Sequence, residues 1–110
     1  MSITHLVLFQ FKADVSAEVI KDASSRLLAL KDACVHPTSQ QPYVKSVSGG
    51  VDNSPEGISG GITHAFVMEF ANEEDRAYYV SQDPAHKAFV QSLDGLVEKV
   101  QVIDFTDRVF

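Results

Sequence analysis

The sequence predicts an α+β fold in which a four-stranded antiparallel sheet carries helices on one face. Two observations lead to this prediction. Apolar residues alternate with period two in some segments and recur at steps of three and four in others, which separates strands from amphipathic helices. In chain order these segments are strand, helix, strand, strand, helix, strand, the order of a split βαβ unit. With 110 residues, the chain is expected to form one domain over 1–110.

The first half of the chain contains one strand and one long helix. The strand is expected at 3–11, where apolar side chains occupy both faces and so indicate a central position in the sheet. A helix follows from Ser16, a favourable N-cap residue, to Cys34. Its apolar stripe consists of Ile20, Ala23, Leu27, Leu30 and Cys34. The turn-forming segment 35–42 ends this helix.

The second half begins with a more polar strand at 43–49, which we expect nearer an edge. The loop 49–61 then holds five of the six glycines. A strand at 62–70 repeats the alternation of the first. A helix with acidic residues in its first turn is expected from Asn72 to about Ser81. A second helix restarts at Pro84, and the last strand is expected at 99–105.

The helices are expected to cover one sheet face and leave the other bare. We assign to the bare face a set of large apolar side chains: Val7, Phe9, Phe11, Phe66, Met68 and Phe70. Such a patch is too large to remain in water. Pairing two sheets face to face buries it, so we expect a ferredoxin-like protomer in a homodimer that forms an α+β barrel.

Charge and composition exclude several classes of protein. A net charge of −6 argues against nucleic acid and anionic membranes as partners. A single cysteine, Cys34, excludes an internal disulfide and a cysteine-based zinc site. No apolar run approaches the ~20 residues that cross a bilayer, and no charged leader precedes the first strand. We therefore expect a cytoplasmic location, with no membrane as partner.

Three histidines are the candidate site residues. His5 and His64 each lie near the start of a strand, with the same parity as the phenylalanines. We expect these two strands to be adjacent and parallel, which would place both imidazoles at one end of the sheet. His86 follows the helix-opening pair Asp83–Pro84, where the helix dipole disfavours a protonated ring. A neutral, proton-accepting imidazole fits that position.

Structural roles are the alternatives for these residues. His5 and His64 could be core or interface histidines bonded to the backbone, and His86 a solvent-exposed residue at a helix start. The neighbouring Tyr78 and Tyr79 could simply pack against the core. A three-histidine metal site is a further alternative, but no local ligand spacing supports it, and we expect no metal and no cofactor.

Five segments resemble the stress-responsive dimeric A/B barrel domain family. They are HLVLFQFK (5–12), GGVDNSPEG (49–57), GITHAFVMEF (61–70), DRAYYVSQDPAHKAFV (75–90) and VIDF (102–105). They occur in the family's order and extend over nearly the whole chain. The resemblance implies a ferredoxin-like protomer in a face-to-face homodimer.

The family includes plant stress-induced proteins and enzymes of the olivetolic acid cyclase type, which close a linear polyketide by an aldol condensation without metal or cofactor. The resemblance implies that His86 is the general base, that Tyr79 is a hydrogen-bond donor, and that His5 and His64 also belong to the site. In that cyclase the tyrosine stands six residues before the histidine, whereas here Tyr79 stands seven before His86. We expect an apolar barrel cavity for the substrate, lined by Phe9, Phe66, Met68, Tyr78 and Phe89.

The sequence therefore predicts a small cofactor-independent cyclase or lyase that acts on a polyketide-like or aromatic-precursor substrate. Two alternatives stay open. One is a non-enzymatic stress-responsive dimer that binds a small apolar ligand. The other is a monooxygenase or haem-handling relative, because dimeric ferredoxin-like barrels also carry those chemistries.

Overall fold

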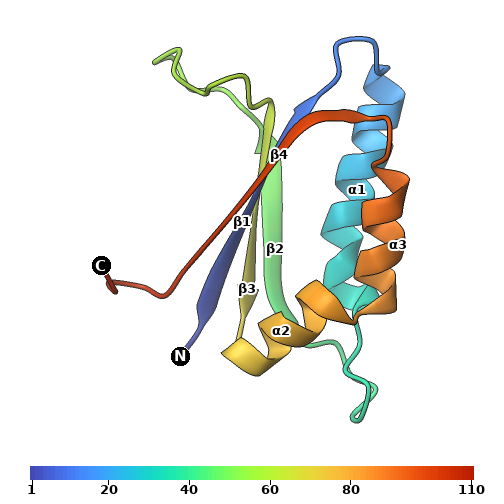
Figure 1. Cartoon of the computed structure of the whole chain (residues 1–110), viewed down its shortest axis with the longest axis vertical. Helices are drawn as coiled ribbons and strands as arrows, with labels where there is room; N and C mark the ends of the chain where they lie inside the picture. The colour runs from blue at the N-terminus through green and yellow to red at the C-terminus, as the bar shows by residue number, and fades with distance from the viewer.

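A computed structural model describes residues 1–110 as one antiparallel sheet with three helices (Figure 1). The elements are β1 (Ile3–Phe11), α1 (Ala17–Ala33), β2 (Val44–Val51), β3 (His64–Phe70), α2 (Glu73–Ser81), α3 (Pro84–Ser92) and β4 (Val97–Phe105). The strand order is β2-β3-β1-β4, so β1 and β3 are the central strands. The predicted α+β class and ferredoxin-like arrangement are confirmed.

Each helix begins at a side chain that caps its first turn. Ser16 accepts a hydrogen bond of 3.2 Å from the backbone N–H of Val19 in α1. Asn72 accepts one of 2.8 Å from the N–H of Asp75 in α2. Asp83 caps α3, as the Asp–Pro pair predicts. None of these helices has both the length and the hydropathy needed to cross a bilayer.

The direction of the central strands corrects one prediction. β1 and β3 are antiparallel, with His5 opposite Met68 and Phe9 opposite His64. The crossover through α1 makes β2 parallel to β1, and β3 lies between them as the returning arm of a hairpin, so it runs opposite to both. His5 and His64 therefore share a face of the sheet but lie at opposite ends of the pair.

The face assigned to the phenylalanines was also wrong. The side chains that we placed on the bare face are at most 8% exposed and pack under the helices: Val7, Phe9, Phe11, Phe66, Met68 and Phe70. Their partners in the core include Leu27 and Leu30 of α1 and Phe89 of α3. β1 is apolar on both faces, so its alternation identifies a central strand without showing which face meets the helices.

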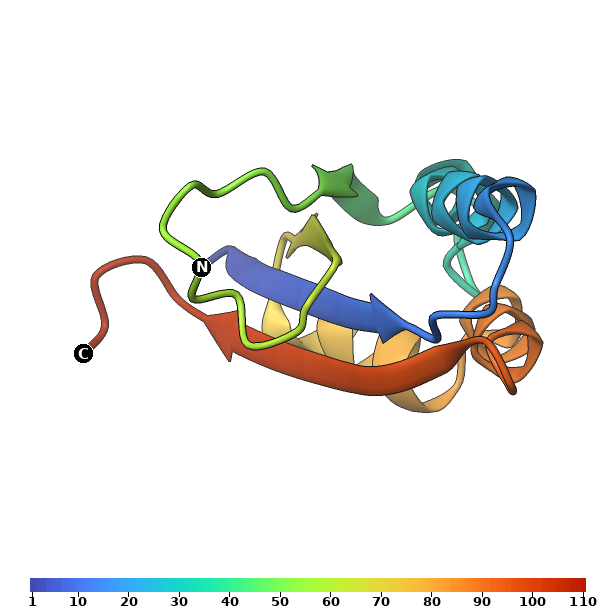
Figure 2. The same cartoon turned by 90° about the horizontal axis from the view of Figure 1, so that it is seen from above.

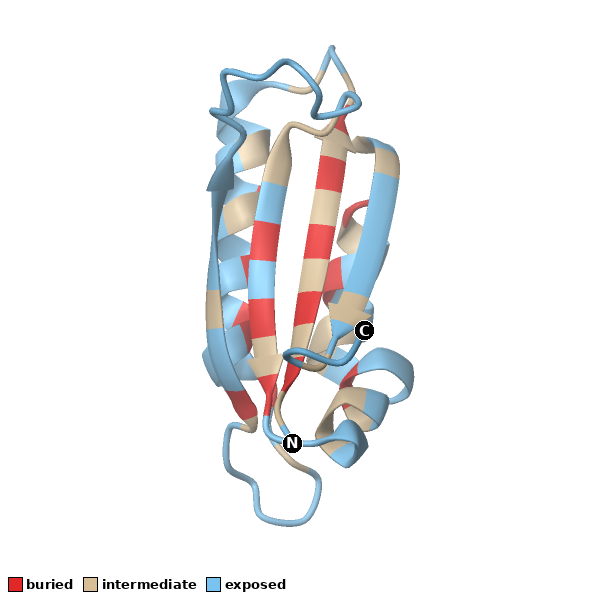
Figure 3. Cartoon of the chain, turned by 90° about the vertical axis from the view of Figure 1, so that its left-hand side faces the viewer, coloured by how far each residue is buried: buried red, intermediate tan, exposed pale blue.

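The bare face, which is turned toward the viewer in Figure 3, carries the residues of opposite parity in each strand. The register places six apolar side chains there: Leu6, Leu8, Ala65, Val67, Ile103 and Phe105. Val67, Ile103 and Phe105 are 40%, 51% and 45% exposed. The loop after β2 and the residues after β4 extend away from α1 and α3 (Figure 2).

Candidate active site

An apolar cavity of about 330 Å³ lies between the sheet and α2 and α3; we call it the inner cavity. Its lining consists of His5, Val7, Phe9, Leu27, Tyr79, Val80, His86, Phe89, Val90, Leu93, Val100 and Val102. Every lining residue except the two histidines is aliphatic or aromatic. Ring nitrogens are therefore the main polar groups available to a molecule inside it.

This location differs from the barrel cavity predicted from the sequence. The inner cavity lies within one protomer, on the helix-covered face, because the phenylalanines face the helices. Of the five predicted lining residues, Phe9 and Phe89 line it. Phe66 and Met68 are fully buried in the neighbouring core. Tyr78 packs instead against Tyr43, with ring centroids 5.7 Å apart.

His86 is held by the backbone of the preceding helix. Its Nδ1 lies 2.8 Å from the carbonyl oxygen of Tyr79. A carbonyl oxygen only accepts, so Nδ1 carries the hydrogen and the lone pair of a neutral ring is on Nε2. Burial lowers the pKa of His86 below its usual value and His5 acts in the same direction, whereas the hydrogen bond to Tyr79 and the charge of Asp83 oppose them.

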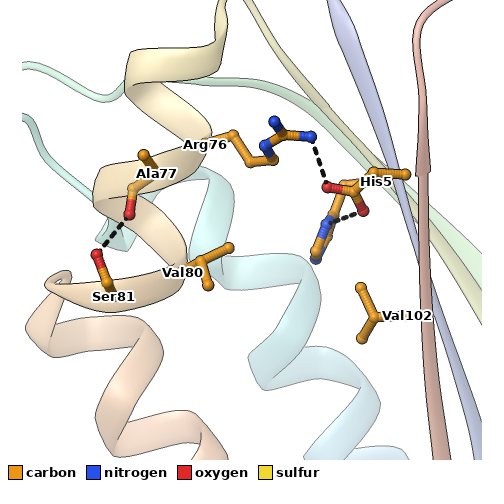
Figure 4. A pocket seen from close by; sticks show the side chains of 7 residues that line it. His5, Arg76, Ala77, Val80, Ser81 and Val102 are labelled. Atoms are coloured by element: carbon orange, nitrogen blue, oxygen red, sulfur yellow. Dashed lines mark hydrogen bonds and ion pairs between the residues drawn. The ribbon is translucent and has the colours of Figure 1, made fainter.

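His5 is oriented by a carboxylate on the neighbouring strand. Its Nδ1 lies 2.6 Å from Oδ1 of Asp104 on β4, and the ring is buried. The other carboxylate oxygen, Oδ2, accepts a hydrogen bond of 3.1 Å from Arg76 of α2 (Figure 4). Asp104 therefore links α2 to the imidazole of His5. Because the carboxylate holds Nδ1, the opposite ring nitrogen, Nε2, points away from Asp104 and toward Val80 and Val102.

Sequence reasoning missed Asp104 and Arg76. They stand 99 and 71 positions after His5, and only the pairing of β1 with β4 brings the aspartate opposite the histidine. One signal was present in the sequence. Asp104 has the same strand parity as Val100 and Val102, so it is a charged residue on a face that is otherwise apolar.

Tyr79 lies between the two histidines. Its ring stacks on that of His86, with centroids 4.0 Å apart, and meets the ring of His5 edge-on at 5.8 Å. Its hydroxyl donates to Sδ of Met68 at 3.5 Å, and burial raises its pKa. The aromatic ring, rather than the hydroxyl, therefore forms part of the cavity wall.

His64 is not part of this group. It lies at the start of β3, where Nδ1 is 2.9 Å from Oγ1 of Thr63 and the ring meets Phe11 edge-on at 5.0 Å. Burial lowers its pKa. The structure thus brings together His5, Tyr79 and His86 and leaves His64 at the other end of the sheet. No three histidine, cysteine, aspartate or glutamate side chains are placed to hold a metal ion.

Asp83 fixes the first turn of α3, which carries His86. Its Oδ1 accepts hydrogen bonds from the backbone N–H groups of Ala85 and His86, at 2.8 and 3.3 Å. Its Oδ2 accepts from the hydroxyl of Tyr43 at 2.5 Å.

The single cysteine, Cys34, is not a nucleophile. Burial, with Asp83 close by, raises the pKa of the Cys34 thiol to about 12, so this thiol is a protonated part of the core.

A second, more open cavity of about 530 Å³ adjoins the first; we call it the outer cavity (Figure 4). Its lining consists of His5, Arg76, Ala77, Val80, Ser81, Val102 and Asp104. His5, Val80 and Val102 line both cavities and form the boundary between them. One end of the combined space is apolar and the other carries charge.

Fold and site together define a small ferredoxin-like domain with a two-histidine apolar cavity. The chain belongs to the stress-responsive A/B barrel domain family (Dabb), whose model matches residues 3–107. This confirms the resemblance found in the sequence. No curated protein matches the chain by sequence.

Two plant proteins of known structure are similar to the chain over nearly its full length. At3g17210 from Arabidopsis thaliana is 30% identical, with a TM-score of 0.82, and the match covers 98% of this chain and 97% of that chain. The hydroxynitrile lyase of Passiflora edulis is 21% identical, with a TM-score of 0.83 and coverages of 99% and 96%.

Bacterial proteins share the fold at lower similarity. SnoaB, a cofactor-independent oxygenase from Streptomyces nogalater, is 14% identical with a TM-score of 0.68, over 99% of this chain and 95% of that one. A dimeric ferredoxin-like protein from Thermobifida fusca is 21% identical with a TM-score of 0.72, over 96% and 91%. The fold therefore occurs both in enzymes and in a protein described as dimeric and of unknown function.

Proposed function

We propose that the protein is a cofactor-independent enzyme of the cyclase or lyase type, with His86 as its general base. Its substrate is a polyketide-like or aromatic carbonyl compound bound in the inner cavity. The observation that carries the proposal is the hydrogen bond from Nδ1 of His86 to the carbonyl of Tyr79. It leaves a lone pair on Nε2, and the lowered pKa keeps the ring neutral near pH 7.

His5 complements this base because its surroundings have the opposite electrostatic character. Nδ1 of His86 bonds to a neutral carbonyl, whereas Nδ1 of His5 bonds to the carboxylate of Asp104. When it carries a proton on both ring nitrogens, His5 also presents Nε2–H as a donor. Two titratable groups in contrasting environments are the usual arrangement for an acid and a base in one site.

The reaction that follows is removal of a proton from carbon next to a carbonyl group. Nε2 of His86 takes the proton, and the electron pair of the C–H bond moves to the carbonyl oxygen as an enolate. His5, when it carries a proton on Nε2, donates a hydrogen bond to that oxygen. In a cyclisation the enolate carbon then attacks a second carbonyl of the same molecule, and the proton on His86 returns to the new alkoxide.

Two structural neighbours support enzyme chemistry in this fold, and one of them is described as cofactor-independent. The Passiflora edulis protein is a hydroxynitrile lyase, and SnoaB is a cofactor-independent oxygenase. Their likeness to this chain is limited to the fold. The proposal for this chain depends on its own histidines and cavity.

We also propose that two protomers pair through the bare sheet face. Its six apolar side chains lie in register across β3, β1 and β4, and a patch of this kind is typical of an interface. The Thermobifida fusca protein with this fold is dimeric. Because the inner cavity opens on the other face, pairing leaves it accessible.

Hydrogen–deuterium exchange tests the base without knowledge of the natural substrate. Phenylacetone in D₂O loses its benzylic proton signal in ¹H NMR when a base removes those protons. We expect the protein to accelerate this loss and His86→Gln to reduce the acceleration by roughly 10²-fold or more. His36→Gln, at a histidine of the 35–42 turn outside the cavity, is the matched control. A folded His86→Gln protein with undiminished exchange would remove the assignment.

Binding without chemistry is the second candidate function, and the apolar lining favours it. Ten of the twelve residues around the inner cavity are hydrophobic. In that case phenylacetone binds saturably and shifts the ring signals of His86, while the exchange rate stays at the buffer value. The same samples therefore distinguish an enzyme from a binding protein.

A further inference from the structure

We propose that the outer cavity binds the carboxylate of an amphipathic substrate through Arg76, while the apolar body of that substrate occupies the inner cavity. This deepens the proposed function by naming a substrate class: an acid with an aromatic or acyl chain. It depends on the proposed function only in using the same inner cavity.

The guanidinium of Arg76 has most of its hydrogen-bonding capacity unused. It makes one hydrogen bond, from Nη1 to Oδ2 of Asp104 at 3.1 Å, although an arginine has five N–H donors. Its side chain is 30% exposed and lines the outer cavity. The planar group matches a carboxylate better than any other side chain does, because two parallel N–H groups meet two oxygens.

The contacts around the outer cavity also leave Arg76 available to an anion. The charged and titratable groups that face it are Arg76 of α2, Asp104 of β4 and His5 of β1. Both oxygens of Asp104 are already engaged, one by His5 and the other by Arg76, so the free N–H groups of Arg76 are the donors left for an incoming anion.

The two cavities are arranged so that one molecule reaches both. His5, Val80 and Val102 form the shared boundary, so a chain that passes between the two valines contacts His5 on the way. An inner volume of about 330 Å³ is at the lower end of the range for small-molecule sites. A phenyl ring with a short alkyl linker is a suitable probe for that space.

Arg76 has one other possible role, which is to attach α2 to β4 through Asp104. A purely structural arginine affects stability but does not distinguish a charged ligand from a neutral one of the same shape. The test therefore compares two ligands with one apolar body, 4-phenylbutanoate and 4-phenylbutan-1-ol, by calorimetry at low salt. Folding of every variant is checked by ¹H–¹⁵N NMR.

We expect the wild-type protein to bind the carboxylate at least about tenfold more tightly than the alcohol, since a hydrogen bond to a charged partner replaces a neutral one. Arg76→Gln should remove this preference, leaving the alcohol's affinity unchanged within twofold, and 0.5 M NaCl should weaken the preference in the wild type. Arg108→Gln is the matched control, because Arg108 also pairs with an aspartate but lies in the exposed C-terminal tail.

Equal affinity of the wild type for both probes, or a preference that survives Arg76→Gln, overturns the proposal. The result is independent of the exchange experiment. If the protein prefers the carboxylate but does not accelerate exchange in phenylacetone, the proposed enzyme function is rejected and the carboxylate site is retained. If it accelerates exchange but shows no carboxylate preference, the carboxylate site is rejected and the enzyme function is retained.

Discussion

The hydroxyl of Tyr43 donates a hydrogen bond of 2.5 Å to Oδ2 of Asp83, and this contact joins the residue before β2 to the cap of α3. Asp83 is 1% exposed, and a carboxylate at that depth is stable only when donors surround it. The backbone N–H groups of Ala85 and His86 supply the others. The turn that carries His86 is therefore fixed from two sides.

Replacing Asp83 by alanine should lower stability more than the loss of an ordinary cap. The change removes the N-cap of α3, which should lower the free energy of unfolding by about 1 kcal/mol. It also leaves the Tyr43 hydroxyl without its acceptor, which should lower it by about 1–3 kcal/mol more. Urea unfolding measures the difference. Ser16→Ala, which removes the cap of α1, is the control and should cost only about 1 kcal/mol. Equal losses for the two variants would show that the Tyr43 contact adds nothing.

Stability should fall as the pH is lowered below about 6.5, the ordinary pKa of an unfolded histidine. Burial lowers the pKa of both His86 and His64 in the folded state, so between the folded and unfolded values the unfolded chain binds more protons. Stability then rises with pH in this window and is constant above it, as far as these groups determine it. Urea unfolding at pH 7.5 and 5.5, at one protein concentration, measures the change.

The double variant His86→Gln/His64→Gln should lose less stability between the two pH values than the wild type does. His36→Gln serves as the control, because His36 lies in the 35–42 turn, away from the cavity and from the sheet end that holds His64. If the double variant shows the full loss, other groups cause the acid sensitivity.

Adjacent glycines of β2 should respond differently to alanine. A Cβ on Gly49 would overlap the ring of Phe66 and lie 2.8 Å from the carbonyl oxygen of Ala65. A Cβ on Gly50 meets nothing within 4 Å. Gly49→Ala should therefore cost about 1–3 kcal/mol of unfolding free energy. Gly50→Ala should leave it unchanged or raise it by up to about 1 kcal/mol, because alanine loses less backbone entropy than glycine. Similar changes in unfolding free energy for the two variants would show that the ring of Phe66 does not lie against Gly49.

The bare face predicts a dimer in solution. Sedimentation equilibrium at micromolar concentration should give twice the protomer mass of 12.0 kDa. Val67→Glu places a charge among the apolar side chains of that face and should give a monomer. Val19→Glu is the matched control, because Val19 is equally exposed (39%, against 40% for Val67) but lies on α1. A wild-type monomer at this concentration would contradict the prediction.

Local features of the fold were predictable from the sequence because each depends on a few neighbouring residues. The apolar stripe of α1 and the caps at Ser16 and Asp83 are examples, and both caps are as predicted. Strand direction and face were not predictable in this way. Both faces of β1 are apolar, with Val7 and Phe9 on one and Leu6 and Leu8 on the other, so alternation alone does not choose between them.

The site was predicted in part, for the same physical reason. His86 follows a local helix-start signal, and its link to Tyr79 spans only seven residues. The pairing of His5 with Asp104 spans 99 residues and depends on which strand lies beside β1. The expected pair of His5 and His64 failed because it depended on the wrong strand direction.

Gln82 and Asp83 are the only residues between α2 and α3. The base belongs to one helix and the carbonyl that orients it to the other, so the length of this two-residue connection sets the rotation of α3 about its own axis. One residue inserted as helix would turn α3 by about 100°. The sheet and α1 would be untouched, while the imidazole would leave the cavity. In this architecture a single insertion can therefore separate the capacity for catalysis from the capacity to fold.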